Sequence, residues 1–368
     1  MSTPPTQLRP AARTKAQIKR ASAAARRAAD RLDARQLEAL ERRYRAAADE
    51  IDAAIMARAG ETGNLRLSVL QDLRAQMDGI ITRLGEERDA MLFAGLDEAA
   101  ELGVQPFEQA VAGTTLARVP EEAVRFVRTF VAEDGLQLSD RLWRLDNGAR
   151  RMVGEAVESA VIQGHSASQA ATDLLSRGEA VPAEIQAKMD AAAGGRVSRA
   201  ARSALLRDDG NARHNALRVM RTELNRAHGE AYMLGGQEHP DFVGFRFLLS
   251  PRHPRRDICD MHASANLHGL GAGVYPSREA TPWPAHPNTL SYVEIVFDDE
   301  VTEDDRAAET DRLSWLKDQE PGVQEAVLNS RKKAAALRQG LLKENQINTP
   351  WSVLKTRYER QGVDVEAL

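Results

Sequence analysis

Over most of the chain, apolar residues recur at steps of three, four and seven positions, which is the spacing of an amphipathic helix. The first stripe comprises Leu37, Leu40, Tyr44, Ile51 and Ile55. The second stripe comprises Leu67, Leu70, Leu73, Met77, Ile80, Ile81 and Leu84. Each stripe would cover one face of a helix and pack it against a neighbour. We therefore expect helices over residues 11–135.

Residues with strong boundary preferences mark further helix ends. Pro120, followed by two glutamates, favours a helix start, because proline fits the first turn and acidic side chains stabilise that end. Farther along, we expect one helix to end at Gly164. The small and polar residues over 191–212 predict a flexible connection before the next strong helix. Helical patterns return over 312–345 and after Pro350.

The period changes from helical to alternating in two short segments, 242–250 and 292–298. Apolar side chains there occupy every second position, which is typical of strands with one buried face. We expect these strands to pair, with residues 250–292 projecting between them as a loop. The predicted fold class is mainly α with a small α+β core. A long N-terminal helical region precedes helices packed against a small antiparallel sheet, and a helical C-terminal tail follows.

Composition narrows the class of protein. Hydrophobic residues make up 42% of the chain, enough for a packed core, and aromatic residues only 5%, which suits helices better than sheets. A net charge of −4 argues against a general nucleic-acid binder. Residues 1–50, here called the basic arm, are different: twelve Lys and Arg stand against six Asp and Glu. Two interpretations stay open, a solvated helix face and an arm near DNA phosphates or an acidic partner.

Cysteine content and hydropathy indicate the compartment. A single cysteine excludes an internal disulfide, so a reducing compartment fits. The first twenty residues lack the apolar stretch of a signal peptide, and no apolar run approaches the roughly 18 residues that a membrane helix needs. We expect a soluble protein of the cytoplasm with no membrane partner.

Residues 250–292, here called the Cys/His loop, hold most of the candidate chemistry. A loop this long is unusual without a staple or a function. Cys259 and His262, in a Cys-x-x-His pattern, are followed at a distance by His286. These are zinc-ligand types, and a metal would close a long loop. Cys259, His262 and His286 are therefore the candidate metal ligands, and zinc is the candidate metal.

The remaining ligand and the metal itself stay open. Side chains that could complete a tetrahedron are His253, His268, Asp257 and Asp260. Without a metal, Trp283, Tyr275, the prolines and buried histidine hydrogen bonds would hold the loop instead.

Enzymatic activity finds little support in these residues. Three ligands plus a water would be a catalytic zinc geometry, and Cys259 beside a histidine could be a nucleophile with its base. However, the chain lacks an HExxH motif. The Gly-rich segment 269–273 lacks the Lys-Ser/Thr of a phosphate-binding loop and is expected to make turns. We expect no enzyme, with a metal-dependent hydrolase or nuclease as the alternative and a DNA-binding accessory protein as another.

Several segments in a fixed order resemble the phage Mu F-like minor head proteins, also called the phage head morphogenesis family. A helix comes first, then a strand, a D-x-C-x-x-H pattern, a Gly-rich stretch, P-x-H-P-N and a closing strand. The matching residues are Arg221, Thr222, Glu223, Cys259, His262, the stretch 269–276, Pro284, His286 and Pro287. The family commonly has cysteines after the His-Pro pair. Thr289 and Ser291 stand there in this chain, which weakens the prediction of a metal.

The resemblance implies a minor capsid protein of a tailed phage or prophage. Such proteins are present in few copies inside the head near the portal, and in the host cytoplasm during assembly. They assist capsid assembly, DNA packaging or genome delivery. The implied partners are the portal protein, then the major capsid protein or scaffold, and packaged DNA through the basic arm.

The resemblance also divides the chain into three regions. Residues 1–140 would be the helical region on the portal and DNA side. Residues 141–300 would be the Mu F-like core domain with the Cys/His loop. Residues 301–368 would be an acidic linker and the helical tail.

Overall fold

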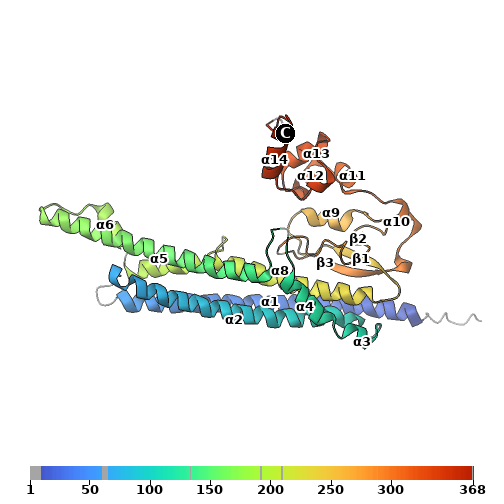
Figure 1. Ribbon diagram of the computed structural model, residues 1–368, viewed down its shortest axis with the longest axis horizontal. Coiled ribbons are helices and arrows are strands. Elements are labelled where there is room, and N and C mark those ends of the chain that lie inside the picture. The colour runs from blue at the N-terminus through green and yellow to red at the C-terminus, as the bar shows by residue number, and fades with distance from the viewer. Residues whose placement is uncertain are drawn as a thin grey trace, which may run out of the picture. The chain divides into compact units, whose positions relative to one another are not determined.

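The computed structural model describes residues 10–59, 65–132, 134–190, 193–208, 210–287, 289–366 and 368. It confirms the predicted fold class: the described chain is mainly helical, with one three-stranded antiparallel sheet (Figure 1). The α-helices are α1 (Pro10–Ala59), α2 (Leu70–Val104), α3 (Gly113–Leu116), α4 (Val119–Thr129), α5 (Leu138–Ser176), α6 (Ala183–Met189), α7 (Gly194–Leu206), α8 (Ala212–Gln237), α9 (Ile258–Ser264), α10 (Glu303–Ala307), α11 (Arg312–Lys317), α12 (Pro321–Val327), α13 (Arg331–Arg338) and α14 (Trp351–Arg360). The strands are β1 (Phe242–Leu248), β2 (Val274–Tyr275) and β3 (Tyr292–Phe297).

The chain forms two compact units, and neither is continuous in sequence. Unit 1 comprises Met1–Ala29, Glu98–Val124 and Asn225–Leu368, and unit 2 comprises Asp30–Asp97 and Arg125–Leu224. These two units do not test the predicted division into three sequence regions, which stays a prediction. No helix among the described residues is long and apolar enough to cross a membrane.

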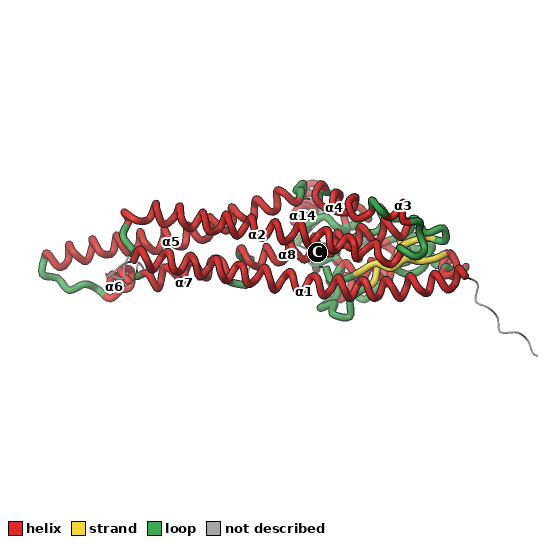
Figure 2. The backbone as a smooth tube through the Cα atoms, turned by 90° about the horizontal axis from the view of Figure 1, so that it is seen from below, coloured by secondary structure: helices red, strands yellow, loops and turns green. Residues whose placement is uncertain are grey.

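Unit 2 is built from helices that run alongside one another, among them α2, α5 and α7 (Figure 2). The predicted apolar stripe of α2 is buried, with Leu73, Met77 and Ile81 almost inaccessible. A charged group is buried with it. Arg88 of α2 is only 2% exposed and places its guanidinium 2.6 Å from Asp89 and 2.7 Å from Asp146 of α5.

Two sequence predictions in unit 2 were wrong. The helix predicted to end at Gly164 continues as α5 to Ser176, because a buried face formed by residues such as Val161 and Ala167 runs past the glycine. Packing of that face outweighs the roughly 1 kcal/mol that a helical glycine costs. The predicted flexible connection contains α7, whose Val197, Ala201 and Leu205 are buried at helical spacing.

Unit 1 holds the sheet, whose strand order is β2-β1-β3. The predicted pairing of the two long strands is confirmed: β1 and β3 are antiparallel, with Phe247 opposite Val293 and Phe245 opposite Ile295. Strand β2 was not predicted; it pairs with the other edge of β1 and places Tyr275 opposite Phe245.

The unit 1 part of α8 is bonded to the sheet through Tyr232. Its hydroxyl accepts the N–H of Ile295 in β3 at 3.1 Å and lies 2.9 Å from the Ser22 hydroxyl of α1. The Tyr232 ring also contacts the ring of Phe245, with centroids 6.4 Å apart. The sheet is thereby tied to both helices.

The helices of the C-terminal tail, α11 to α14, pack on α9. Met261 of α9 and Ala265, the C-cap of that helix, belong to a buried apolar cluster with Leu316, Leu337 and Leu354 of the tail. The predicted last helix begins after Pro350, as expected. Because α9 is packed on the tail and also lies beside the sheet, its residues are firmly positioned (Figure 1).

Candidate metal-binding site in the Cys/His loop

A capping arrangement fixes the start of α9. Asp257 is the N-cap, and its Oδ1 accepts the backbone N–H of Cys259 at 2.8 Å. In return, Asp260 Oδ2 accepts the backbone N–H of Asp257 at 2.8 Å. These two bonds satisfy N–H groups that a helix start otherwise leaves open. The Asp-x-Cys spacing therefore places the second oxygen of Asp257 and the thiol of Cys259 close together.

The thiol of Cys259 lies in an apolar enclosure. Cys259 is fully buried beside Phe247 of β1 and Tyr275 of β2, and Trp283 packs on the same cluster. Such a cysteine is usually inert packing. Here, however, one side of the thiol faces polar groups from the far end of the loop.

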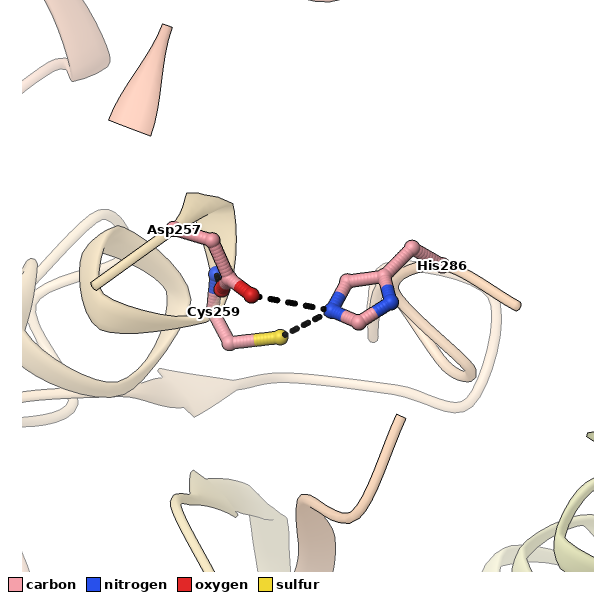
Figure 3. A group of neighbouring side chains, drawn as sticks. All are labelled: Asp257, Cys259 and His286. Carbon is pink, nitrogen blue, oxygen red and sulfur yellow. Dashed lines mark hydrogen bonds and ion pairs between the residues drawn. The ribbon is translucent and has the colours of Figure 1, made fainter. Parts of the chain in front are cut away.

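His286 reaches this thiol from the end of the Cys/His loop. Its Nε2 lies 3.2 Å from Cys259 Sγ and 3.3 Å from Asp257 Oδ2 (Figure 3). Its Nδ1 lies 3.0 Å from the Pro287 carbonyl oxygen. A carbonyl oxygen can only accept, so Nδ1 carries the donated proton and Nε2 is the nitrogen that faces the other two side chains.

Asp257 and His286 shift each other's pKa in opposite directions. Burial alone would raise the pKa of Asp257, but hydrogen bonds from His286 and the Cys259 backbone outweigh it and lower the pKa to about 2. Hydrogen bonds to Asp257 and Cys259 raise the pKa of His286 to about 10. Without a metal, the pair is therefore a carboxylate and an imidazolium at neutral pH. A metal ion would take the place of the Nε2 proton.

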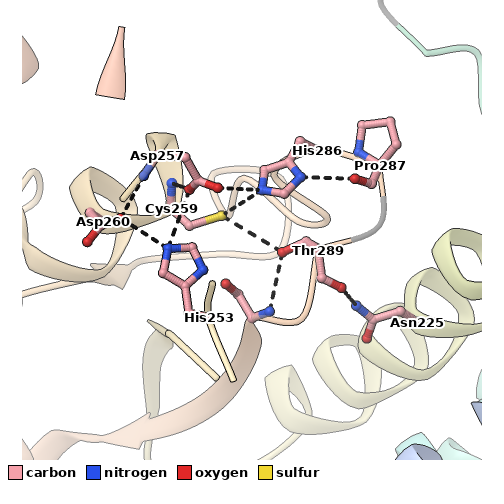
Figure 4. A network of polar contacts seen from close by, with 9 residues as sticks. Asn225, His253, Asp257, Cys259, Asp260, His286, Pro287 and Thr289 are labelled. Atoms are coloured by element: carbon pink, nitrogen blue, oxygen red, sulfur yellow. Dashed lines mark hydrogen bonds and ion pairs between the residues drawn. The ribbon is translucent and has the colours of Figure 1, made fainter. Parts of the chain in front are cut away.

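A second histidine lies on the other side of Asp257. His253 Nε2 is 3.1 Å from Asp260 Oδ2 and 3.8 Å from Asp257 Oδ1 (Figure 4). Asp257 thus faces one histidine with each of its oxygens. Both acidic groups of the α9 start are thereby engaged within the loop.

The predicted ligand set is only partly brought together. Cys259 and His286 meet, but His262 lies elsewhere and its Nδ1 is 3.0 Å from the Tyr275 hydroxyl. His262 is buried, and burial together with Arg312 lowers its pKa to about 4. Asp257 occupies the place expected for His262. Sequence reasoning offered Asp257 only as one of several fourth ligands, although its role as N-cap beside Cys259 was readable in the Asp-x-Cys spacing.

The two positions where the family commonly has cysteines also line this site. Thr289 Oγ1 lies 3.8 Å from Cys259 Sγ and accepts the backbone N–H of Ser291 at 3.3 Å. Both residues are buried. Asn225 of α8 donates its side-chain N–H to the Thr289 carbonyl at 3.2 Å (Figure 4). Thr289 and Ser291 therefore belong to the surroundings of Cys259.

Further contacts seat the loop on α8. Glu230 of α8 is buried and ion-paired with Arg278 of the loop. The Trp283 ring lies so close to Gly229 that a Cβ there would be 2.0 Å from the indole nitrogen. The predicted turns of the Gly-rich segment are present, with Gly269 and Gly273 at φ of 62° and 70°. The aromatic contacts and the buried histidine hydrogen bond expected of a metal-free loop are found as well, between Phe247 and Trp283 and between His262 and Tyr275.

The arrangement does not match a nucleophilic triad. In a triad, the base contacts the nucleophile with one ring nitrogen and its orienting carboxylate with the other. Here both Cys259 and Asp257 contact Nε2 of His286, while Nδ1 is held by a backbone carbonyl. Three donor atoms converging on one point suit a cation better than proton relay. The expectation that the chain is not an enzyme stays a prediction.

The basic arm is partly engaged within unit 1; its residues 1–9 lie outside the described part of the chain. Lys15 Nζ lies within 3.0 Å of Asp241, Asp298 and Asp299. Burial would lower the pKa of Lys15, but these carboxylates raise it well above its usual value. Lys19 pairs with Glu294 at 2.8 Å. These lysines therefore anchor α1 to the acidic end of the sheet.

Comparison of the chain with protein-family models, with curated proteins and with solved structures finds no match.

Proposed function

We propose that the chain is a minor capsid protein of a tailed phage or prophage, of the Mu F-like head morphogenesis type, bound to the portal inside the head. The observation that supports this most directly is the way the resembling segments assemble. From Asn225 onward, α8 carries the Cys/His loop through Asn225 and Glu230, and β3 closes the loop against β1. The Cys/His loop and the strands that flank it thus belong to one compact unit, whereas Arg221, Thr222 and Glu223 fall in unit 2.

The proposed partner is the portal protein, with the major capsid protein or scaffold as further contacts. A protein of this kind works through its surfaces rather than through turnover. We propose that it resides in the host cytoplasm during assembly and then inside the virion near the portal.

Contact with packaged DNA through the basic arm is part of the proposal. Since Lys15 and Lys19 are occupied by carboxylates, the contact rests on other residues. Arg20 and Arg27 are exposed and lie seven residues apart, which places them on the same face of α1. Their guanidinium groups suit phosphate oxygens.

Co-expression with the portal protein of the same phage or prophage tests the proposal. The two proteins are expected to co-purify and to co-elute in size-exclusion chromatography. The portal protein of an unrelated phage serves as the matched control and is expected to leave the chain unbound. If circular dichroism shows that the chain is folded but it does not bind the portal protein of its own phage or prophage, the proposal is contradicted.

A metal-dependent hydrolase or nuclease is the second candidate, favoured by the convergence of Asp257, Cys259 and His286. It predicts metal-dependent cleavage of phosphodiester substrates that Cys259→Ala abolishes while the fold persists. Absence of turnover by metal-loaded protein across DNA and RNA substrates would remove this candidate.

A further inference from the structure

We infer that Asp257, Cys259 and His286 bind one Zn²⁺ ion, with a solvent molecule as the fourth ligand. The carboxylate oxygen, Sγ and ring nitrogen of these residues all lie within 4.8 Å of one another. They come from the two ends of the Cys/His loop, since Cys259 and His286 are 27 positions apart. The ion would tie the end of the loop to the start of α9.

The spacing of the donor atoms fits a tetrahedral ion. Zinc bonds of about 2.3 Å to sulfur and about 2.0–2.2 Å to nitrogen and oxygen imply ligand separations of about 3.4–3.6 Å at tetrahedral angles. Two of the three separations are 3.2 Å from Sγ to Nε2 and 3.3 Å from Nε2 to Oδ2, and the third, from Sγ to the carboxylate, lies within 4.8 Å. An outward shift of a few tenths of an ångström would admit the ion.

The orientation of His286 is a second, independent observation. Histidines that bind metals usually donate their other ring N–H to a carbonyl or carboxylate, which fixes the ring and its tautomer. His286 does so through Nδ1 and the Pro287 carbonyl at 3.0 Å. The remaining nitrogen faces the thiol and the carboxylate (Figure 3).

The donor types select zinc among common cations. A thiolate with an imidazole favours zinc over magnesium or calcium, which take oxygen ligands. Mixed sulfur, nitrogen and oxygen sets with one open position occur in zinc sites. The side chain of His286 is about one-third exposed, while Cys259 is fully buried.

The neighbouring acidic group is a weaker candidate. His253, Asp257 and Asp260 also cluster, but the Asp260 oxygen that faces His253 also accepts the Asp257 N–H as part of the helix cap. Binding there would disrupt that cap, whereas Asp257 Oδ2 is free of the capping bond to Cys259, which uses Oδ1.

The ion would hold the end of the loop against the start of α9, and this inference does not depend on binding to the portal. Closing a long loop restricts the unfolded chain more than the folded one. Metal binding and portal binding can therefore fail separately.

Metal content of the purified full-length chain tests the inference. After dialysis against ZnCl₂ and then metal-free buffer, elemental analysis should find one zinc per chain. Cys259→Ser and Asp257→Asn should each weaken binding by more than about 100-fold. Asn preserves the N-cap, so the second variant removes a ligand without removing the cap. His262→Gln is the matched control and should retain the zinc, because its side chain contacts Tyr275.

Cobalt provides a readout that does not depend on variants folding. The Co²⁺-loaded wild-type chain should show a sulfur-to-metal charge-transfer band and the intense visible bands of a four-coordinate ion. Zinc absent from the wild type, or cobalt without a sulfur band, would overturn the inference. Loss of zinc in His262→Gln with retention in Asp257→Asn would overturn the ligand set. Circular dichroism confirms that each variant is folded.

Discussion

The Nε2 atom of His286 lies 3.2 Å from the Sγ atom of Cys259, although 27 positions separate the two residues. This contact folds the Cys/His loop back onto its own beginning. Asp257, Thr289 and the Pro287 carbonyl complete the surroundings (Figure 4). The loop is therefore held by specific contacts, and single substitutions at these contacts should change the stability of the protein.

The close packing of the Cys/His loop on α8 predicts that a small substitution in α8 lowers the stability of the protein. Gly229→Ala would place a methyl group 2.0 Å from the Trp283 nitrogen, so the loop must move. We expect a loss of about 1–3 kcal/mol in the free energy of unfolding. Gly79→Ala on α2 is the control, since nothing lies within 4 Å of its Cβ, and it should be neutral or stabilising. Urea denaturation measures both; equal effects would contradict the close contact.

The buried charge of unit 2 predicts a contrast between two arginines of α2. Arg88→Met leaves Asp146 and Asp89 without their buried partner and should cost about 3 kcal/mol. Arg83→Met removes a surface pair with Glu50, in which both side chains are more than half exposed, and should cost less than about 1 kcal/mol. Thermal unfolding of the two variants compares them, and similar losses would show that Arg88 is not buried as described.

His262 predicts a pH dependence of stability. Its pKa in the folded chain is about 4, below the usual value near 6.5, so the unfolded chain binds more protons between these values. The free energy of unfolding should therefore fall as pH drops from about 6.5 toward 4, by about 1 kcal/mol per unit from this group. Denaturation in chelator compares wild type with His262→Gln. A difference between them that stays constant over this range would refute the assignment.

The proposed DNA contact predicts a change in salt dependence. If Arg20 and Arg27 each neutralise a phosphate, the double alanine variant should lower the slope of log affinity against log salt by about 1.8. The pair Arg252 and Arg255, also exposed, provides a matched variant at another surface and should leave the slope unchanged. Fluorescence anisotropy with duplex DNA measures both. A slope unaffected by the α1 variant would remove the arm from the DNA contact.

Local periodicity predicted the elements that bury one regular face. The stripe through Leu73, Met77 and Ile81 marks α2, and the alternation around Phe245 and Phe247 marks β1. The same patterns missed α7. Its buried residues Val197 and Ala201 lie among glycines and polar residues, which are typical of a loop. Periodicity also missed β2, because a strand of two residues is too short to show an alternating pattern.

The candidate site was predictable in composition but not in geometry. Cys259 and His286 were identified by residue type, and they do meet. The exclusion of His262 depends on Tyr275, whose position is set by pairing of β2 with β1, a contact that no local pattern encodes. Asp257 joins the site because it caps α9, so local helix chemistry decided the third donor.

The most direct test of the proposed function is quantitative mass spectrometry of purified capsids, intact and after disassembly to portal rings. We predict that the chain is present in far fewer copies than the major capsid protein and remains with the portal ring. Its absence from the particles, with the chain found free in the cell during particle production, would contradict the proposal.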